Sequence, residues 1–136
     1  NFVKAKNFDF IVFSAFDHNN YDVRDANWAN GVSKFIDRID TKAKIIQLID
    51  TPKPYGDSVA CLSSNAKNLK ACDFPVQKVI KIENFKIKYI DPTPWLCPSK
   101  CLVVLNGVNT YRDGSHISVS AAEFLAPQIE RALLSN

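Results

Sequence analysis

The sequence predicts an α/β fold with a mainly parallel sheet. Three observations lead to this prediction: a largely apolar segment at residues 8–15, an amphipathic segment over Ala26–Ile39, and a second apolar segment at 44–50. The two apolar segments are short and rich in β-branched and aromatic residues, which is typical of buried strands. Strand, helix and strand in this order form a βαβ unit, so the strands should be parallel and the crossover right-handed.

The predicted helix should have one apolar face. Its apolar residues recur at spacings of three and four, and the charged residues between them should face water. These apolar residues are Trp28, Val32, Phe35, Ile36 and Ile39. We expect Trp28 to lie in the core.

Further elements follow the second strand. Residues 52–75 predict a long polar connection, and residues 76–82 fit a strand or a short helix equally well. Residues 85–90 alternate between apolar and polar side chains and predict a third strand, which an Asp-Pro dipeptide ends. Residues 102–105 and 108–111 flank an Asn-Gly dipeptide and predict a β-hairpin.

The chain should end in a helix that begins near Ser118. Its apolar positions are Ala121, Phe124, Leu125, Ile129, Ala132 and Leu133. Ser120 with Glu123 three residues later fits a capping box, and Ser118 is the alternative N-cap. Pro127 lies inside this helix and should kink it or delay its regular part.

The composition is that of a globular protein, with 46% hydrophobic and 23% charged residues in a chain of 136. The formal net charge of +3 comes from 17 basic and 14 acidic residues, which are scattered along the chain. Nucleic-acid binding needs a concentrated basic stripe, so we expect no nucleic-acid partner. No apolar run approaches the roughly 20 residues of a membrane span. Because the sequence begins at Asn1 without Met, we expect a piece of a longer precursor, with any targeting segment outside it.

The four cysteines form two pairs that are each local in sequence, Cys61 with Cys72 and Cys97 with Cys101. A four-thiolate zinc site is one interpretation, but the spacing of the first pair is too wide for a zinc knuckle. Two short-loop disulfides fit the spacing better, and they indicate a domain exported to an oxidising compartment.

An Asp-x-x-His sequence, Asp113 to His116, provides the strongest candidate for catalysis. In a tight turn the carboxylate can reach the imidazole, fix its tautomer and stabilise the cation that forms when the ring takes a proton. The alternative is that Asp113 only closes a turn and His116 is a surface residue. The other histidine, His18, is a second candidate for a base or a metal ligand, although a surface role fits it better.

The residues around this element resemble a known family. Residues 95–104 and 108–118 resemble the C-terminal block of SGNH domains, most closely those fused to membrane acyltransferases that O-acylate bacterial cell-surface polysaccharides. The strand at 45–50, its proline-rich loop and the first cysteine pair match as well. The resemblance implies a three-layer α/β sandwich of the SGNH or flavodoxin-like type, with residues 1–136 forming a single domain or the C-terminal part of one.

The resemblance also implies a function. His116 would deprotonate a serine and Asp113 would orient His116, giving O-acyl transfer or ester hydrolysis on cell-surface carbohydrate with no metal or organic cofactor. The domain would lie on the periplasmic or extracellular side of a bacterial membrane, tethered to a transmembrane acyltransferase domain or paired with its missing N-terminal half. A non-catalytic binding or accessory module that keeps the fold without the nucleophile is the alternative.

The serine itself is not evident in this chain. Family members open with a strand followed by Gly-Asp-Ser, and we expect that block to lie N-terminal to Asn1. One such tripeptide occurs at Gly56-Asp57-Ser58, but it follows two prolines in a polar loop, and no helix is expected after it. We therefore interpret it as a turn and do not expect Ser58 to be the nucleophile.

Three other residues have two readings each. Asn19 and Asn20 follow the first strand, where a side-chain amide could donate to an oxyanion, but a solvated loop is the simpler interpretation. Trp95 beside the second cysteine pair either packs on the disulfide, which we favour, or stacks on a sugar.

Finally, a piece that lacks the first βα units exposes a sheet edge, so we expect it to be dimeric or associated with its other half.

Overall fold

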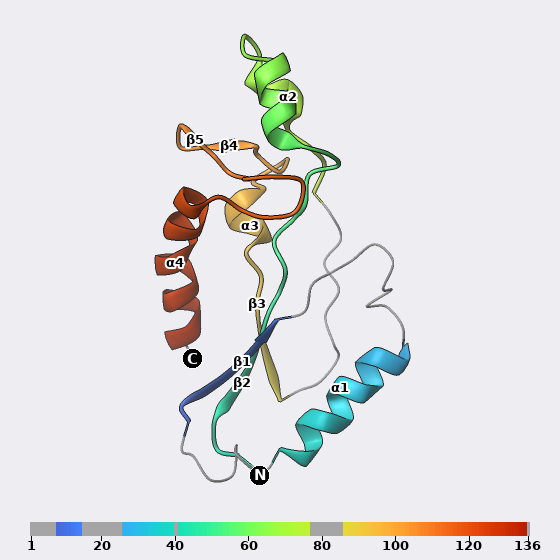
Figure 1. Ribbon diagram of the computed structural model, residues 1–136. Helices are drawn as coiled ribbons and strands as arrows, with labels where there is room; N and C mark the ends of the chain where they lie inside the picture. Colours follow the sequence, from blue (N-terminus) through green and yellow to red (C-terminus); the bar gives the residue numbers. More distant parts are fainter. Residues whose placement is uncertain (1–7, 15–25, 40, 77–85, 136) are drawn as a thin grey trace. The chain divides into compact units, whose positions relative to one another are not determined.

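The computed structural model describes residues 8–14, 26–39, 41–76 and 86–135. Its contacts divide the chain into two compact units. The first consists of Asn1–Asp50 with Val79–Ile90, and the second of Thr51–Lys78 with Asp91–Asn136. Each unit has its own elements and its own core, and each is described below by itself (Figure 1).

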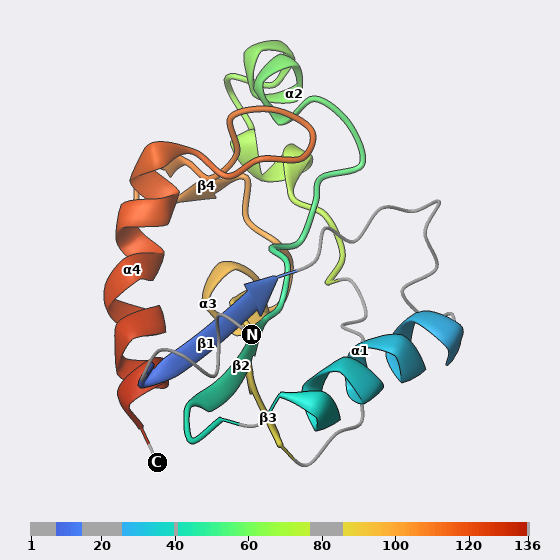
Figure 2. The same cartoon turned by 60° about the horizontal axis from the view of Figure 1, so that its bottom comes forward.

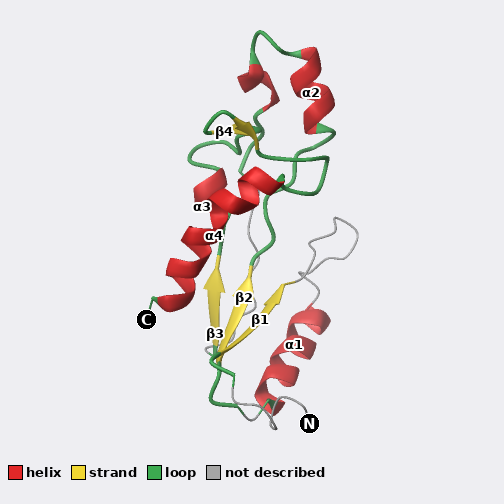
Figure 3. Ribbon diagram, turned by 60° about the vertical axis from the view of Figure 1, so that its left-hand side comes forward, coloured by secondary structure: helices red, strands yellow, loops and turns green. Residues whose placement is uncertain are grey.

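The first unit contains a parallel sheet of three strands. These are β1 (Phe10–Ser14), β2 (Lys44–Leu48) and β3 (Ile87–Ile90), in the spatial order β1-β2-β3. In Figure 3 the three arrows run side by side in the same direction. The predicted α/β class and the parallel pairing of the first two strands are therefore confirmed. Both β1 and β3 are edges of the described sheet, and the expected association at such an edge stays a prediction.

Helix α1 (Ala26–Arg38) covers one face of this sheet. Alternation along the strands places Phe13, Ile45 and Ile87 on the same face, and these side chains pack with Val32 and Ile36 of the helix. Ile36 is fully buried, because it lies at the centre of this contact.

The apolar face of α1 is narrower than the sequence predicted. Phe35 is 63% exposed, so its assignment to the buried face was wrong. Successive residues in an α-helix are about 100° apart, and Phe35 is therefore turned well away from its buried neighbour Ile36. The side chain of Trp28 lies outside the described residues, as does the segment 77–85, which includes most of the undecided stretch 76–82.

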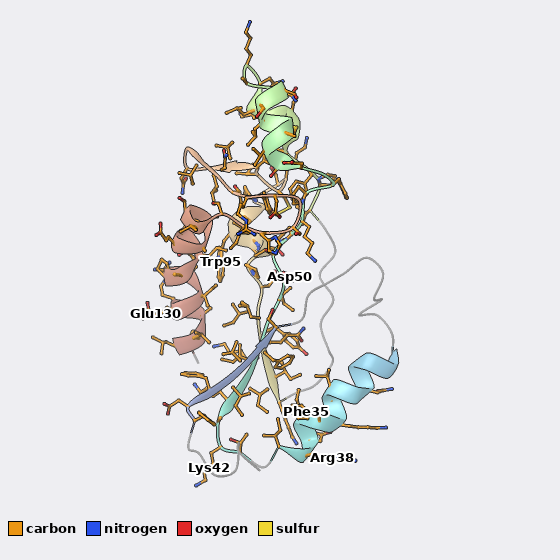
Figure 4. The ribbon with its side chains drawn as sticks, viewed as in Figure 1. Phe35, Arg38, Lys42, Asp50, Trp95 and Glu130 are labelled. Atoms are coloured by element: carbon orange, nitrogen blue, oxygen red, sulfur yellow. A yellow bond between two sulfur atoms is a disulfide. The ribbon has the colours of Figure 1, made fainter. Side chains whose placement is uncertain are left out.

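The second unit is built from short elements and one long helix. In chain order they are α2 (Ser58–Ser64), the 3-10 helix η1 (Leu69–Cys72), α3 (Thr93–Leu96), β4 (Val104–Leu105), β5 (Val108–Asn109) and α4 (Val119–Leu134). Their core is one cluster that includes the fully buried side chains of Leu96, Val103, Tyr111 and Leu125. Trp95 packs against the same cluster, which includes Cys97 and Cys101, and its expected contact with the disulfide itself stays a prediction (Figure 4).

Both predicted disulfides are present. Cys61 is bonded to Cys72 and Cys97 to Cys101, and no described cysteine is free. The first bond joins α2 to η1, so the connection that was predicted as a polar loop contains two short helices. Periodicity could not find α2, because its seven residues, SVACLSS, are mostly small and span only about two turns.

The hairpin and the final helix follow the sequence closely. Asn106 and Gly107 have φ values of 52° and 82°, as a type I′ turn requires, although each strand has only two paired residues. Helix α4 buries Ala121 and Leu125 and is not delayed by Pro127. Its N-cap is Ser118, whose hydroxyl accepts from the backbone N–H of Ala121, so the capping box at Ser120 was wrong.

We predict that the unreduced protein has no reactive thiol, and that four thiols react after denaturation and reduction. Replacing Cys61 and Cys72 together by Ala should lower the free energy of unfolding by about 3 kcal/mol, because the unfolded chain regains the freedom of the loop between them. Thiol titration and urea unfolding measure the two effects. A reactive thiol in the unreduced protein would contradict the pairing.

Candidate active site

The Asp113–His116 element lies in a closed loop of the second unit. Tyr111 and Ile117 form an isolated antiparallel bridge, and the backbone N–H of Arg112 donates to the carbonyl of His116 at 2.8 Å. The loop therefore begins and ends at one point, directly after the hairpin and before α4. Figure 2 shows it passing beside the start of α2. Its closure brings residues three apart in sequence onto one side of the turn.

The carboxylate of Asp113 is the acceptor at the centre of this loop. Its Oδ1 accepts from the backbone N–H groups of Ser115 and His116, each at 2.8 Å, and from the hydroxyl of Ser115 at 3.2 Å. The two backbone hydrogen bonds hold the pKa of Asp113 well below its ordinary value, and the bond from Ser115 has the larger effect. Asp113 is therefore ionised at neutral pH.

The imidazole of His116 is held by the same carboxylate. Its Nδ1 lies 2.9 Å from both Oδ1 and Oδ2 of Asp113. An ionised carboxylate can only accept, so Nδ1 carries the hydrogen and Nε2 is left with its lone pair. The side chain of His116 is 60% exposed, so this nitrogen can be reached from outside. The arrangement is that of a general base with an orienting carboxylate.

Arg112 also contacts this carboxylate. Its Nε lies 3.3 Å from Oδ2 of Asp113, and its side chain is 69% exposed. An exposed ion pair of this kind contributes little to stability. The position of the carboxylate is thus set by the backbone donors rather than by Arg112.

The structure brings the Gly56-Asp57-Ser58 turn against the loop. The hydroxyl of Ser58 donates to the backbone carbonyl of Asp113 at the long distance of 3.5 Å. A Cβ on Gly114 would lie 3.3 Å from the carbonyl oxygen of Gly56, so the two turns are in close contact. Sequence reasoning missed this contact, and the only signal for it was a glycine in each turn.

Ser58 occupies a different setting from the one expected. It begins helix α2, so the expectation that no helix follows it was wrong. Asp57 is the N-cap of this helix, and its Oδ1 accepts from the backbone N–H groups of Val59 and Ala60. Ser58 is only 3% exposed, and its hydroxyl donates to the main chain of Asp113 rather than to the ring of His116. Burial and this orientation both disfavour Ser58 as a nucleophile.

The other candidates, His18, Asn19 and Asn20, lie outside the described residues. Within the described parts of the chain, no three His, Cys, Asp or Glu side chains are grouped as metal ligands would be. The helices of that same part are all too short or too polar to cross a membrane.

Comparison with known proteins adds a family to this geometry. A family model described as "SGNH domain (fused to AT3 domains)" matches residues 3–131. Neither a curated protein nor a solved structure matches the chain.

We predict that His116 is protonated on Nδ1 at neutral pH when uncharged, because Asp113 accepts from that nitrogen. Long-range ¹H–¹⁵N spectra report the tautomer directly. Asp113→Asn should abolish this preference, whereas Asp57→Asn, which alters a carboxylate in the neighbouring turn, should leave it in place. A wild-type ring with its hydrogen on Nε2 would contradict the assignment.

The pKa of Asp113 leads to a second prediction. The pKa of Asp113 in the folded protein lies below the unfolded value of about 3.9. The ionised carboxylate therefore stabilises the fold at every pH above about 3.9, and this stabilisation is lost only as the pH falls through the folded-state pKa. The ¹³C carboxyl signal of Asp113 should therefore show no protonation of the carboxyl group between pH 7 and about 4. A midpoint at or above 3.9 would show that the backbone donors do not act as described.

Proposed function

We propose that this chain, which belongs to the family of SGNH domains fused to AT3 domains, carries the aspartate and histidine of a Ser-His-Asp site. Family membership indicates acyl transfer or ester hydrolysis. The finer proposal is that the reaction moves an acyl group to or from a hydroxyl of cell-surface carbohydrate.

The observation that carries the proposal is the contact between Asp113 and His116. Two carboxylate oxygens at 2.9 Å from Nδ1 fix the ring and direct Nε2 away from the turn. A base held in this way needs no reorientation before it accepts a proton, and the ionised Asp113 stabilises the imidazolium that results.

The proposed reaction has two halves. Nε2 of His116 takes the proton of a serine hydroxyl while the serine oxygen attacks the carbonyl carbon of an ester. The tetrahedral intermediate then expels the alcohol, which receives the proton back from Nε2 and leaves an acyl-serine. In the second half, Nε2 deprotonates a water molecule or a sugar hydroxyl, whose oxygen takes the acyl group. The serine oxygen leaves and recovers its proton from Nε2. Water gives hydrolysis, and a sugar hydroxyl gives transfer.

The serine in this proposal does not come from Ser58, which is buried against the main chain of Asp113. We assign it to the Gly-Asp-Ser block with which family members open. Asn19 and Asn20 remain the candidates for an oxyanion donor, in the part of the chain that precedes α1.

The setting of the reaction is part of the proposal. Two disulfides support an oxidising compartment on the outer side of a bacterial membrane. The fusion named for the family fits a domain tethered to an acyltransferase domain. In that position the Asp–His turn would meet polysaccharide that is already outside the cell.

The experiment is a comparison of variants in the complete protein. His116→Ala should lower the rate of hydrolysis of 4-nitrophenyl acetate, and of acyl transfer to polysaccharide, by about 10²–10⁴-fold, the range of a general base. Asp113→Asn should follow it in the same direction.

His18→Ala is the matched control, because it removes the other histidine of the chain. It should leave the rate near that of the wild type. Equal rates for His116→Ala and the wild type would sink the proposed base and favour the non-catalytic module instead.

A further inference from the structure

A cavity of about 360 Å³ lies beside the Asp–His turn, entirely within the second unit. One wall is formed by residues 54–58 and the other by residues 71–75, and the disulfide between Cys61 and Cys72 joins the two sides. Its volume falls in the range of pockets that hold small ligands. The disulfide ties helix α2, which continues from the first wall, to the second wall, and so restricts how far the two walls can separate.

An aromatic side chain stands at this cavity with most of its surface uncovered. Tyr55 is 77% exposed and meets Phe74 edge to face, with ring centroids 6.0 Å apart. Phe74 is buried and lies 5.7 Å from the ring of Tyr111, two residues before Asp113. Because Phe74 leaves most of Tyr55 uncovered, a flat ring with a polar tip is presented to the solvent.

Two carboxylates also line the cavity. Oδ1 of Asp57 accepts from the start of α2, and Oδ1 of Asp73 accepts from the backbone N–H of Val103 at 3.1 Å. These hydrogen bonds hold both carboxylates in place. A carboxylate offers about four lone-pair sites, so each keeps the capacity to accept from further hydroxyl groups.

The cavity and the proposed base share a wall. Gly56 and Ser58 line the cavity, and the same two residues contact Gly114 and the carbonyl of Asp113. A ligand held here is therefore in contact with the segment that supports the Asp–His turn.

We propose that this cavity is a sugar subsite, in which one pyranose ring lies on the face of Tyr55 and its hydroxyls donate to Asp57 and Asp73. A pyranose has an apolar C–H face for the aromatic ring and a rim of donors for the carboxylates, which matches what the cavity offers. An acyl chain has no donors, so it would displace water from the remaining lone pairs of both carboxylates without replacing those hydrogen bonds. The sugar subsite rests on the proposed function for its catalytic use, but not for its binding.

Binding is tested in the complete protein with the His116→Ala background, so that turnover plays no part. Saturation-transfer NMR with methyl β-D-glucopyranoside and methyl N-acetyl-β-D-glucosaminide should show contact of the C–H face for at least one of them. Tyr55→Ala should weaken that binding about tenfold, and Tyr55→Phe should keep it. Phe35→Ala, an equally simple loss of an exposed aromatic ring in the other unit, should have no effect.

Kinetics give the second readout. With an acetylated oligosaccharide as substrate, Tyr55→Ala should raise KM about tenfold, and His116→Ala should lower kcat instead. Sugar binding that persists while His116→Ala has no effect on rate would overturn the proposed function and support the subsite. The subsite would be overturned if Tyr55→Ala bound both glycosides as well as the unsubstituted protein does. It would also be overturned if the protein bound hexanoate through Tyr55 and bound neither sugar.

Discussion

The two backbone N–H groups that point at the Asp113 carboxylate are the interaction on which the candidate site depends. They fix one oxygen at 2.8 Å from both Ser115 and His116, and the same carboxylate then fixes the imidazole through Nδ1. Backbone donors keep the carboxylate charged without burying it, so the pair can operate in an exposed loop. The bridge between Tyr111 and Ile117 holds this loop closed, and the N-cap of α4 follows it immediately.

A second constraint comes from the disulfide-tied segment. Helix α2 begins at Ser58, and the turn before it touches Gly114 so closely that a methyl group there would press on the carbonyl of Gly56. The loop that carries His116 thus has a rigid neighbour. The same neighbour forms one wall of the cavity that Tyr55 lines, so support for the proposed base and the proposed sugar contact come from a single short stretch of chain.

Much of this could be predicted from the sequence, because periodicity and turn chemistry are local. The strands β1 to β3, helix α1, the Asn-Gly hairpin, the pairing of the cysteines and the Asp–His contact all depend on neighbours in sequence or on a family resemblance. Phe35 shows the limit of periodicity, since the boundary of an apolar face is set by the sheet it meets. The contact of Gly56 with Gly114 is a tertiary approach of two turns, and no local pattern encodes it.

The short span of both disulfides has a consequence for how the chain matures. The partners are 11 and 4 residues apart, and in each case the native partner is the nearest cysteine along the chain. Closing a longer loop costs more chain entropy than closing a shorter one. The native pairing therefore closes the shortest loops open to each thiol, and scrambling of the two pairs would require longer loops to close first.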